Sequence, residues 1–362
     1  VGNCAENFSD CNGPKIHNFL RIFLQMAMVL EFKSKKRVIK IGRIAGQYAK
    51  PHSSDFEIVE GEKIPSYRGD IVNDFNKTLE QRTPNPNRLL EGYFRSASTL
   101  NLIRAFIQGG YNDISNIKDW ESHFFSKEIS GLDYYKKFAK DVTMSLDKGA
   151  NKNFKSDQIY ISHEALLLDY EEIFTRFDTT RGGYYDTSAH FLWIGDRTRQ
   201  IDSAHIEFIS GLGSPVGLKV GPIFEMDEII AVLKKVNPEN KDGKVVLICR
   251  MGCKEILNKL PVLIKKIKSE NINTTFICDP MHGNTYCHGD IKVRDFEDIV
   301  KEITLFFEIC KNENTIPGGL HLEITEENVT ECTGGINKLK LSDLNKNYVS
   351  KVDPRLNAAQ AL

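Results

Sequence analysis

Side chains that can bind a metal or transfer a proton recur in this sequence at the ends of short apolar runs. The run from Thr275 to Cys278 stops at Asp279-Pro-Met-His282, and this histidine can ligate a metal or move a proton. Other apolar runs lead in the same way to Arg43, His163 and Glu164, Asp196 and Arg197, Lys219, Arg250, and Glu323. Reactive residues at so many run ends indicate one site that is assembled from several strands.

One set of polar residues combines a sulfur, an imidazole and two carboxylates: Cys4, His282, Glu323 and Asp353. If the fold brings them together, they can bind one divalent cation. Mixed sulfur, nitrogen and oxygen ligation favours manganese, iron, cobalt or zinc over magnesium. Taken singly, a cysteine or histidine is more often packed in a core, and an aspartate before a proline is more often a helix cap. Their shared position at strand ends is what favours a metal site.

A second set consists of cations near strand ends: Arg43, Lys50, Arg197, Lys219 and Arg250. Buried like charges repel one another, so this set predicts a substrate with two phosphates or two substrates with one phosphate each. The alternative is pairing of several cations with Glu6, Glu164, Asp196 or Asp202. Arg199 and Arg294 are expected to be ordinary surface or salt-bridge residues. A metal beside such cations suits aldol-like carbon–carbon chemistry, and metal-dependent hydrolysis of phosphate esters is the alternative.

The elements that must position these residues alternate between strands and helices. Strands are expected at 38–41, 159–162, 191–194, 217–218, 245–248, 275–278 and 318–322, and helices at 16–32, 226–236, 255–268 and 296–310. A further strand ending at Val1–Cys4 makes eight. The pattern predicts an α/β fold, a (β/α)₈ TIM barrel with its site at the strand carboxyl ends. The alternative is a doubly wound open sheet, but no glycine-rich nucleotide fingerprint follows any strand.

Residues 1–362 are expected to form a single barrel domain with one helical insertion at 71–150, between strands 2 and 3. The chain between the loop at 43–54 and the strand at 159–162 is far longer than one crossover helix requires. Helical periodicity is clear at 88–108 and continues at about 117–146. An insertion of this length usually covers a substrate, binds a regulator or forms a subunit contact.

Composition limits the classes of partner. The chain is 41% hydrophobic with a formal net charge of −1, which argues against nucleic acid or an acidic membrane surface as a partner. No apolar run reaches the roughly 18 residues that span a bilayer. The eight cysteines lack zinc-ribbon spacing, and Cys249 and Cys278 are expected in the core. A cytoplasmic location is expected, with a plastid as the alternative because the chain opens at Val1 inside a motif and its start is expected to be missing.

Long motifs spread along the chain resemble the class II (plant-type) 3-deoxy-D-arabino-heptulosonate 7-phosphate (DAHP) synthases. The matching stretches are GRIAGQYAKP at 42–51, YRGD at 67–70, SHEALL at 162–167, WIG at 193–195, RTRQ at 197–200, KVGP at 219–222, DPMHGNT at 279–285, NVTEC at 328–332 and DPRLN at 353–357. Members of this family are (β/α)₈ barrels that condense phosphoenolpyruvate with erythrose 4-phosphate at the entry to the shikimate pathway. The resemblance implies the same reaction here.

The resemblance also implies a role for each site residue. Cys4, His282, Glu323 and Asp353 match the metal ligands, with Mn²⁺ or Co²⁺ expected and Zn²⁺ or Fe²⁺ as alternatives. Arg43, Arg197, Lys219 and Arg250 match the groups around phosphoenolpyruvate, beside Asp196, and Glu164 matches a position close to the reacting carbons. Lys50, Pro51, His52 and Ser53 match the contacts to the aldose phosphate. Lys219, Glu164 and His282 are the catalytic candidates; Lys219 and Glu164 are the candidates for handling protons, with metal-bound water as a rival.

Four positions depart from the family pattern. Asn3 stands where Asp is usual, His52 where Arg is usual, Asp196 where Glu is usual and Ser214 where Asn is usual. The change at His52 removes a permanent charge and a bidentate fork, which could cost on the order of 1.5–3 kcal/mol of aldose-phosphate binding. One alternative is therefore a relative from specialised metabolism that uses a different aldose. An alternative of another class is a non-catalytic regulatory or partner-binding barrel.

The insertion corresponds to the region where family members carry helices for subunit contact and aromatic amino acid feedback. The resemblance thus implies a homo-oligomer, either a dimer or a tetramer, and an aromatic amino acid as a possible effector. Many relatives have a cysteine just before the DPRLN motif that can pair with the metal-binding cysteine. Val352 occupies that place here, so this disulfide is not expected.

Overall fold

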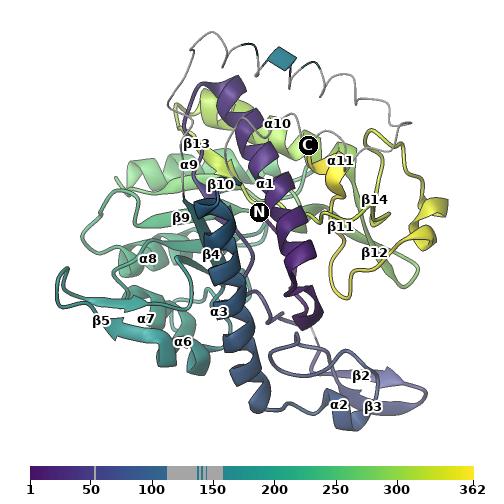
Figure 1. The fold of residues 1–362 in the computed structure, drawn as a ribbon. Coiled ribbons are helices and arrows are strands. Elements are labelled where there is room, and N and C mark those ends of the chain that lie inside the picture. The colour runs from purple at the N-terminus through teal and green to yellow at the C-terminus, as the bar shows by residue number, and fades with distance from the viewer. Residues whose placement is uncertain (53, 112–136, 138–139, 142–143, 145–157) are drawn as a thin grey trace.

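Seven parallel strands form the central sheet of the protein (Figure 1). The computed structural model describes all residues except 53, 112–136, 138–139, 142–143 and 145–157. The strands are β1 (Lys40–Gly42), β4 (Ile159–Glu164), β7 (Phe191–Ile194), β8 (Val216–Val220), β9 (Val245–Cys249), β10 (Thr275–Cys278) and β13 (Pro317–Leu320). They are ordered β1-β4-β7-β8-β9-β10-β13, which is also their order along the chain. That order is typical of successive right-handed strand–helix–strand units.

The first residues of the chain join the two edges of this sheet. Gly2 forms parallel bridges with Arg43, just after β1, and with Glu323, just after β13. Its N–H donates to the Leu322 carbonyl at 3.1 Å, while the Arg43 N–H donates to the Val1 carbonyl at 2.8 Å. A Cβ on Gly2 would lie 2.5 Å from the Arg43 carbonyl oxygen, so only glycine fits here. The expected eighth strand thus closes the (β/α)₈ barrel, and it is short.

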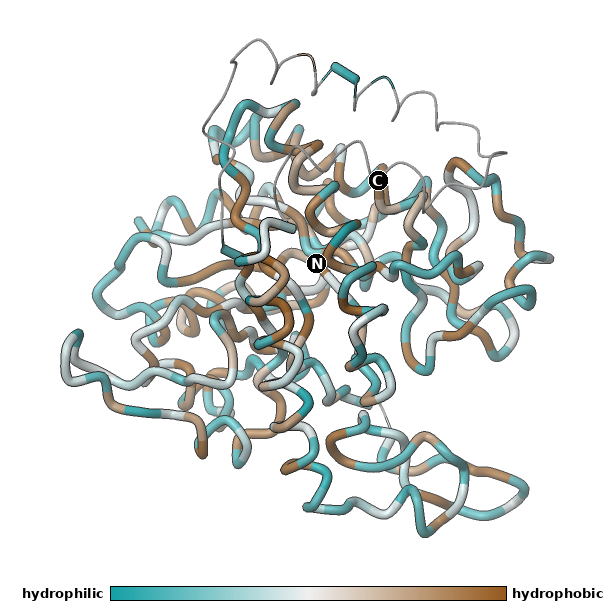
Figure 2. Tube along the Cα trace, viewed as in Figure 1, coloured by the Kyte–Doolittle hydropathy of each residue, from teal (hydrophilic) through white to brown (hydrophobic). Residues whose placement is uncertain are grey.

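Helices follow the strands and cover the barrel from outside. They are α1 (Gly13–Ser34), α3 (Asn87–Gln108), α6 (Leu168–Phe174), α7 (Ala204–Ser210), α8 (Met226–Val236), α9 (Ile256–Ser269) and α10 (Phe296–Asn312). One large apolar cluster joins β7 to β10 with α7 to α10, and a second joins α1 and the loop after β1 to the chain termini. Figure 2 shows hydrophobic stretches through the middle of the molecule and hydrophilic stretches in the outer loops.

Smaller elements are added to the barrel. The hairpin β2 (Phe56–Val59) and β3 (Glu62–Pro65) precedes the short helix α2 (Leu79–Arg82). A second hairpin, β5 (Thr175–Phe177) and β6 (Tyr184–Asp186), follows α6. After β10 come β11 (Thr285–His288) and β12 (Ile291–Asp295), and β12 pairs with β14 (Cys332–Thr333). The chain ends in α11 (Ala358–Ala361).

Most expected boundaries agree with the structure. The strand expected at 275–278 has those bounds. The strand expected at 38–41 is found slightly later, as β1 at Lys40–Gly42. Within the insertion expected at 71–150, the described residues form α2 and α3, and α3 packs against α1. Most of the helical stretch expected at about 117–146 lies outside the described residues. In the part of the chain that is described, no helix is both long and apolar enough to cross a membrane.

Candidate metal centre and substrate cavity

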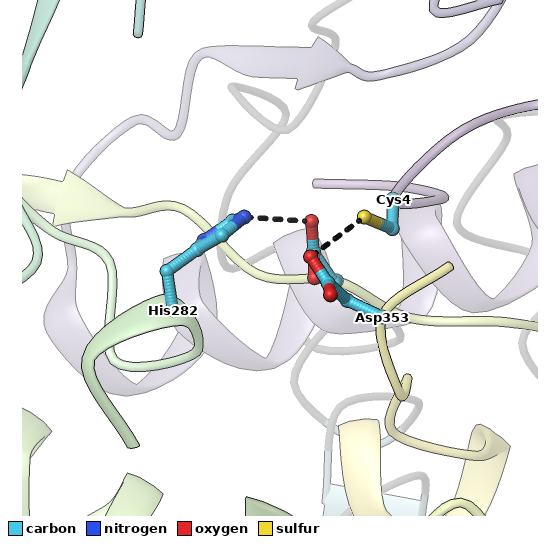
Figure 3. Close-up of side chains that lie close together, drawn as sticks. Cys4, His282 and Asp353 are labelled. Atoms are coloured by element: carbon cyan, nitrogen blue, oxygen red, sulfur yellow. Dashed lines mark hydrogen bonds and ion pairs between the residues drawn. The ribbon is translucent and has the colours of Figure 1, made fainter. Parts of the chain in front are cut away.

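Four ligand candidates meet at the carboxyl end of the barrel. One ligand atom from each of Cys4, His282, Glu323 and Asp353 lies within 4.8 Å of the other three. They come from the segment after Val1–Gly2, from the loop after β10, from the end of β13 and from the carboxyl-terminal tail. Figure 3 shows the side chains of Cys4, His282 and Asp353 pointing toward one another. The barrel closure therefore brings together residues that are up to 349 positions apart in sequence.

The donor set and its surroundings fit a divalent cation. Burial, together with the neighbouring Glu323 carboxylate, raises the pKa of the Cys4 thiol to about 12, so a divalent cation is needed to favour the thiolate. Burial opposes ionisation of Glu323, but His282, Arg294 and Arg43 hold the pKa of this carboxyl well below its usual value. Three buried ligand groups and one half-buried imidazole suit a transition metal with mixed ligands.

Asp279 fixes the orientation of the histidine ligand. Its carboxylate has no exposed surface and lies 2.7 Å from His282 Nδ1, which leaves Nε2 facing Glu323 at 3.1 Å. The same carboxylate pairs with Lys219 Nζ at 3.0 Å. An aspartate three residues before a histidine is a signal that could have been used, because the intervening turn brings the carboxylate to Nδ1. Such outer partners hold metal-binding imidazoles in one tautomer and orientation.

Two buried arginines hold Glu323. Arg43 Nη1 lies 2.9 Å from one carboxylate oxygen and Arg294 Nη1 lies 2.6 Å from the other. Arg294 has no exposed surface, so the expected salt bridge is confirmed and the alternative of a surface position is wrong. Nothing in its sequence context distinguishes Arg294 from other arginines. Arg199 is also buried, and it pairs with Asp196 at 2.9 Å.

Lys50 lies beside the metal ligands. Its ammonium group is 2.7 Å from Cys4 Sγ and also pairs with Asp353. Lys292, which the sequence analysis did not select, pairs with the other Asp353 oxygen at 2.7 Å. Lys50 was expected at the aldose phosphate, and in the structure it borders both the ligand cluster and the adjoining cavity.

A cavity of about 570 Å³ opens next to the ligand cluster. All five selected cations line it, together with the other described substrate-site candidates: Arg43, Lys50, Arg197, Lys219, Arg250, Pro51, His52, Glu164 and Asp196. Ser53 lies outside the described residues. The structure thus brings the expected cations to one place, at the strand ends where the sequence analysis located them.

The cations of the cavity are only partly neutralised. Arg250 pairs with Asp196 at 3.0 Å, as the pairing alternative anticipated. The Nε groups of Arg43 and Arg250 are buried and have no partner among the described atoms. Arg197 is exposed and takes part in none of the ion pairs found among the described residues. Unpaired guanidinium donors that line a cavity indicate an anionic ligand.

Backbone contacts hold the loop after β1 in place. The Glu6 carboxylate accepts the N–H groups of residues 45–47 at 2.7 to 2.9 Å, so Glu6 does not pair with a cation of the cavity. Gln47 Oε1 accepts the Glu164 N–H at 3.0 Å. A Cβ on Gly195 would lie 2.3 Å from Glu164 Oε1, so glycine is required for this carboxylate to reach the cavity.

Burial lowers the pKa of the Lys219 ammonium, although the neighbouring Asp279 carboxylate opposes this shift. Lys219 is buried, lines the cavity and lies 3.5 Å from His282 Nδ1. A lysine with a lowered pKa can release and recover a proton near neutral pH more readily than an exposed lysine. Its position at the border of the cation cluster and the ligand cluster suits proton transfer.

Comparison with known proteins gives a consistent match over the whole chain. The model of the class-II DAHP synthetase family matches residues 1–362. The phospho-2-dehydro-3-deoxyheptonate aldolase of Streptomyces coelicolor is 43% identical over 367 residues, which cover 100% of this chain and 81% of the relative. The enzyme of the same name from Neurospora crassa is 42% identical over 385 residues, which cover 100% of this chain and 79% of that relative.

Among solved structures, the match with the DAHP synthase of Thermotoga maritima covers 58% of this chain and 54% of that chain. The sequence identity is 15% and the TM-score is 0.31. A truncated form of the Thermotoga maritima enzyme gives a TM-score of 0.28 at 16% identity, covering 52% of this chain and 61% of that one.

Proposed function

The chain belongs to the class-II DAHP synthetase family, and from this premise we propose that it condenses phosphoenolpyruvate with erythrose 4-phosphate to give DAHP and phosphate. The relatives with 42% and 43% identity carry the name of this activity. The observation that carries the proposal is the cavity of about 570 Å³, in which the five selected cations adjoin the four-residue ligand cluster. Two phosphorylated substrates account for a cation set of this size.

The ligand cluster is the proposed place of the metal on which the family depends. Cys4, His282, Glu323 and Asp353 would hold it, and we infer Mn²⁺ or Co²⁺, with Zn²⁺ or Fe²⁺ as alternatives. A bound divalent ion supplies Lewis-acid polarisation of the aldehyde. Asp279 keeps His282 Nε2 directed into the cluster, and Arg43 and Arg294 keep both Glu323 oxygens in place.

The cations of the cavity are proposed to bind phosphoenolpyruvate. Lys219 and Arg250 lie at the ends of the neighbouring strands β8 and β9, Arg43 follows β1, and Arg197 lines the same cavity. The guanidinium groups of Arg43 and Arg250, which line the cavity, could donate to the carboxylate or the phosphate of this substrate. Charge-assisted contacts of this kind fix C3 of phosphoenolpyruvate against the aldehyde, and such positioning accounts for much of the catalysis expected here.

Two residues are proposed to handle protons. The C3–C1 bond forms as the aldehyde oxygen takes up a proton, water then adds at C2, and phosphate leaves from C2. Lys219, whose pKa is lowered by burial, is placed to give the first proton. Glu164, which Gln47 and Gly195 hold at the cavity wall, is placed to accept the proton from water.

A second candidate substrate is favoured by the contacts at the β2–β3 hairpin. The His52 ring, just before this hairpin, lies 3.9 Å from the Glu57 carboxylate, and both residues line the cavity. Family members usually have arginine at the position of His52, whose imidazole lacks that permanent charge, and Glu57 beside it is already paired with Arg82 at 3.2 Å. The alternative function is therefore condensation of phosphoenolpyruvate with a different aldose. This aldose would carry no phosphate at the end that lies beside His52, or would carry its phosphate at another position.

We also propose that the protein acts as a homo-oligomer. α3 exposes Leu90, Tyr93 and Phe94, and Ile173 is exposed next to Phe174, whose ring stacks on Tyr93 at 5.5 Å. A gathering of large apolar side chains on the surface is typical of a contact between subunits. The proposal of an aromatic amino acid effector rests on the family resemblance alone.

The experiment that tests the function is phosphate release from phosphoenolpyruvate in the presence of Mn²⁺ or Co²⁺, with and without erythrose 4-phosphate. Release that depends on this aldose and stops with a chelator would support the synthase. Release with another sugar only would favour the alternative aldose. A chain that binds the metal and phosphoenolpyruvate, yet releases no phosphate with any aldose, would contradict both.

A further inference from the structure

A buried carboxylate on α10 lies beneath the loops that carry Arg250 and His282. Glu302 has no exposed surface. One of its oxygens accepts the Gly252 N–H at 2.8 Å, and the other accepts Asn284 Nδ2 at 2.7 Å. None of the ion pairs among the described residues includes Glu302. Burial raises the pKa of the Glu302 carboxyl to about 8, while the hydrogen bonds from Gly252 and Asn284 favour its ionised form and hold it in a defined position.

Asn284 extends this contact across both loops. Its Oδ1 accepts the Cys253 N–H at 2.9 Å, and its Nδ2 donates to the Pro280 carbonyl at 2.8 Å as well as to Glu302. The amide thereby uses both of its N–H groups and its oxygen. The loop after β9 and the loop after β10 are thus tied to each other and to α10 through one asparagine and one glutamate.

The two loops also touch directly. A Cβ on Gly252 would lie 2.7 Å from the Gly283 carbonyl oxygen, and a Cβ on Gly283 would lie 2.4 Å from the Gly252 nitrogen. Arg250 Nη2 donates to the His282 carbonyl at 3.4 Å. Because the backbones of the two loops are in contact, a shift of either loop would move both the Arg250 guanidinium and the His282 imidazole.

We propose that Glu302 is a positioning residue that sets the spacing between the phosphoenolpyruvate-binding Arg250 and the metal-binding His282. This inference rests on the proposed function, because that function gives the two residues their roles. Glu302 does not line the cavity, and it acts through Gly252 and Asn284. Affinity for the metal and affinity for phosphoenolpyruvate therefore depend on one carboxylate that touches neither.

The first test is the Glu302→Gln variant, which preserves the size of the side chain. Both neighbours of the carboxylate are donors, so the new amide NH₂ faces a donor whichever way it is turned. We expect binding of Mn²⁺ alone, and of phosphoenolpyruvate in its presence, each to weaken about tenfold or more, the usual effect of losing an outer-shell partner. Calorimetry on the purified full chain measures both. Glu308→Gln, an exposed position on the same helix, is the matched control and should change neither.

The second test exchanges the two partners. Asn284→Asp alone sets two carboxylates against each other and should weaken both affinities, as Glu302→Gln does. The double variant, Glu302→Gln with Asn284→Asp, places an amide on α10 that can donate to the new carboxylate in the loop. Donor and acceptor are thereby exchanged across the contact between positions 302 and 284, while the donation to the Pro280 carbonyl is lost, so both affinities should recover in part.

Two outcomes would overturn the inference. Wild-type affinities in Glu302→Gln, with only a lower unfolding temperature, would leave Glu302 a purely structural role. Failure of the double variant to recover either affinity, although it folds, would also contradict it. A wild type that binds neither Mn²⁺ nor phosphoenolpyruvate would overturn the proposed function itself, and with it this assignment.

Discussion

The two sides of the cavity differ in how firmly their side chains are held. On the metal side, Glu323 has no exposed surface and pairs with two arginines that are also buried. On the hairpin side, the side chains of His52 and Glu57 are 36% and 28% exposed and lie 3.9 Å apart. Losing one partner of a buried pair leaves an uncompensated charge, whereas an exposed pair contributes little. The metal side should therefore resist substitution, and the hairpin side can change specificity without loss of the fold.

The largest effect is expected for Glu323→Gln on the metal side. The amide can accept from one arginine only, so its NH₂ group faces the other guanidinium. We expect a loss of about 3–5 kcal/mol in the free energy of unfolding, together with loss of metal binding. Denaturant unfolding and Mn²⁺ titration measure the two effects. Glu62→Gln, at an exposed position on the hairpin, is the control, with an expected change of about 1 kcal/mol or less. Equal destabilisation by the two variants would break the comparison.

A smaller effect on the same side is expected for Asp279→Asn. The amide can no longer accept from both His282 and Lys219, so the imidazole loses its fixed orientation. Metal affinity should fall about 10- to 100-fold. Asp196→Asn is the matched variant, because Asp196 holds Arg250 and contacts none of the four ligand candidates. It should weaken phosphoenolpyruvate binding and leave Mn²⁺ affinity unchanged, and a similar loss of Mn²⁺ affinity in both variants would contradict this reasoning.

Much of the barrel and the ligand cluster could be predicted because both follow from a local pattern. Each strand is a short apolar run that stops at a charged residue, and parallel strands place these stops at one end. The eighth strand was harder, since a glycine that bridges two edges gives no apolar run. Its place at Val1–Cys4 followed from counting strands rather than from periodicity.

The groups that hold the site in place could be predicted less well, because each contacts residues that are far away in the sequence. Arg294 gave no sequence signal, and its role depends on the path of β12 beneath Glu323. Glu302 did give one, since it interrupts the apolar face of α10 between Ile299 and Phe306. An acid at a buried helical position is rarely accidental, and its partners are known only once the loops are placed.

On the hairpin side, His52→Arg should change affinity rather than stability. Arginine adds a permanent charge and a bidentate donor at the expected aldose-phosphate position. The apparent affinity for erythrose 4-phosphate should then rise about tenfold, corresponding to the lower end of the value of a charge-assisted bond. The measurement is KM for this aldose, with KM for phosphoenolpyruvate unchanged. His288→Arg, at an exposed position of β11, controls for added charge. An unchanged KM for the aldose would mean that the hairpin side does not hold its phosphate.

The smallest effect is expected for Asn3→Asp, the departure from the family pattern on the metal side. Asn3 Oδ1 already accepts from Arg355 Nη1 at 3.1 Å, and Arg355 is also paired with Glu331 at 2.8 Å. An aspartate would keep the same contact and add charge to a guanidinium that is already neutralised. We expect a change of about 1 kcal/mol or less in the free energy of unfolding, with no change in KM for either substrate. A large change in metal affinity would show that position 3 influences Cys4. The departure at Asn3 would then not be neutral, and its contrast with the departure at His52, which is expected to alter specificity, would be lost.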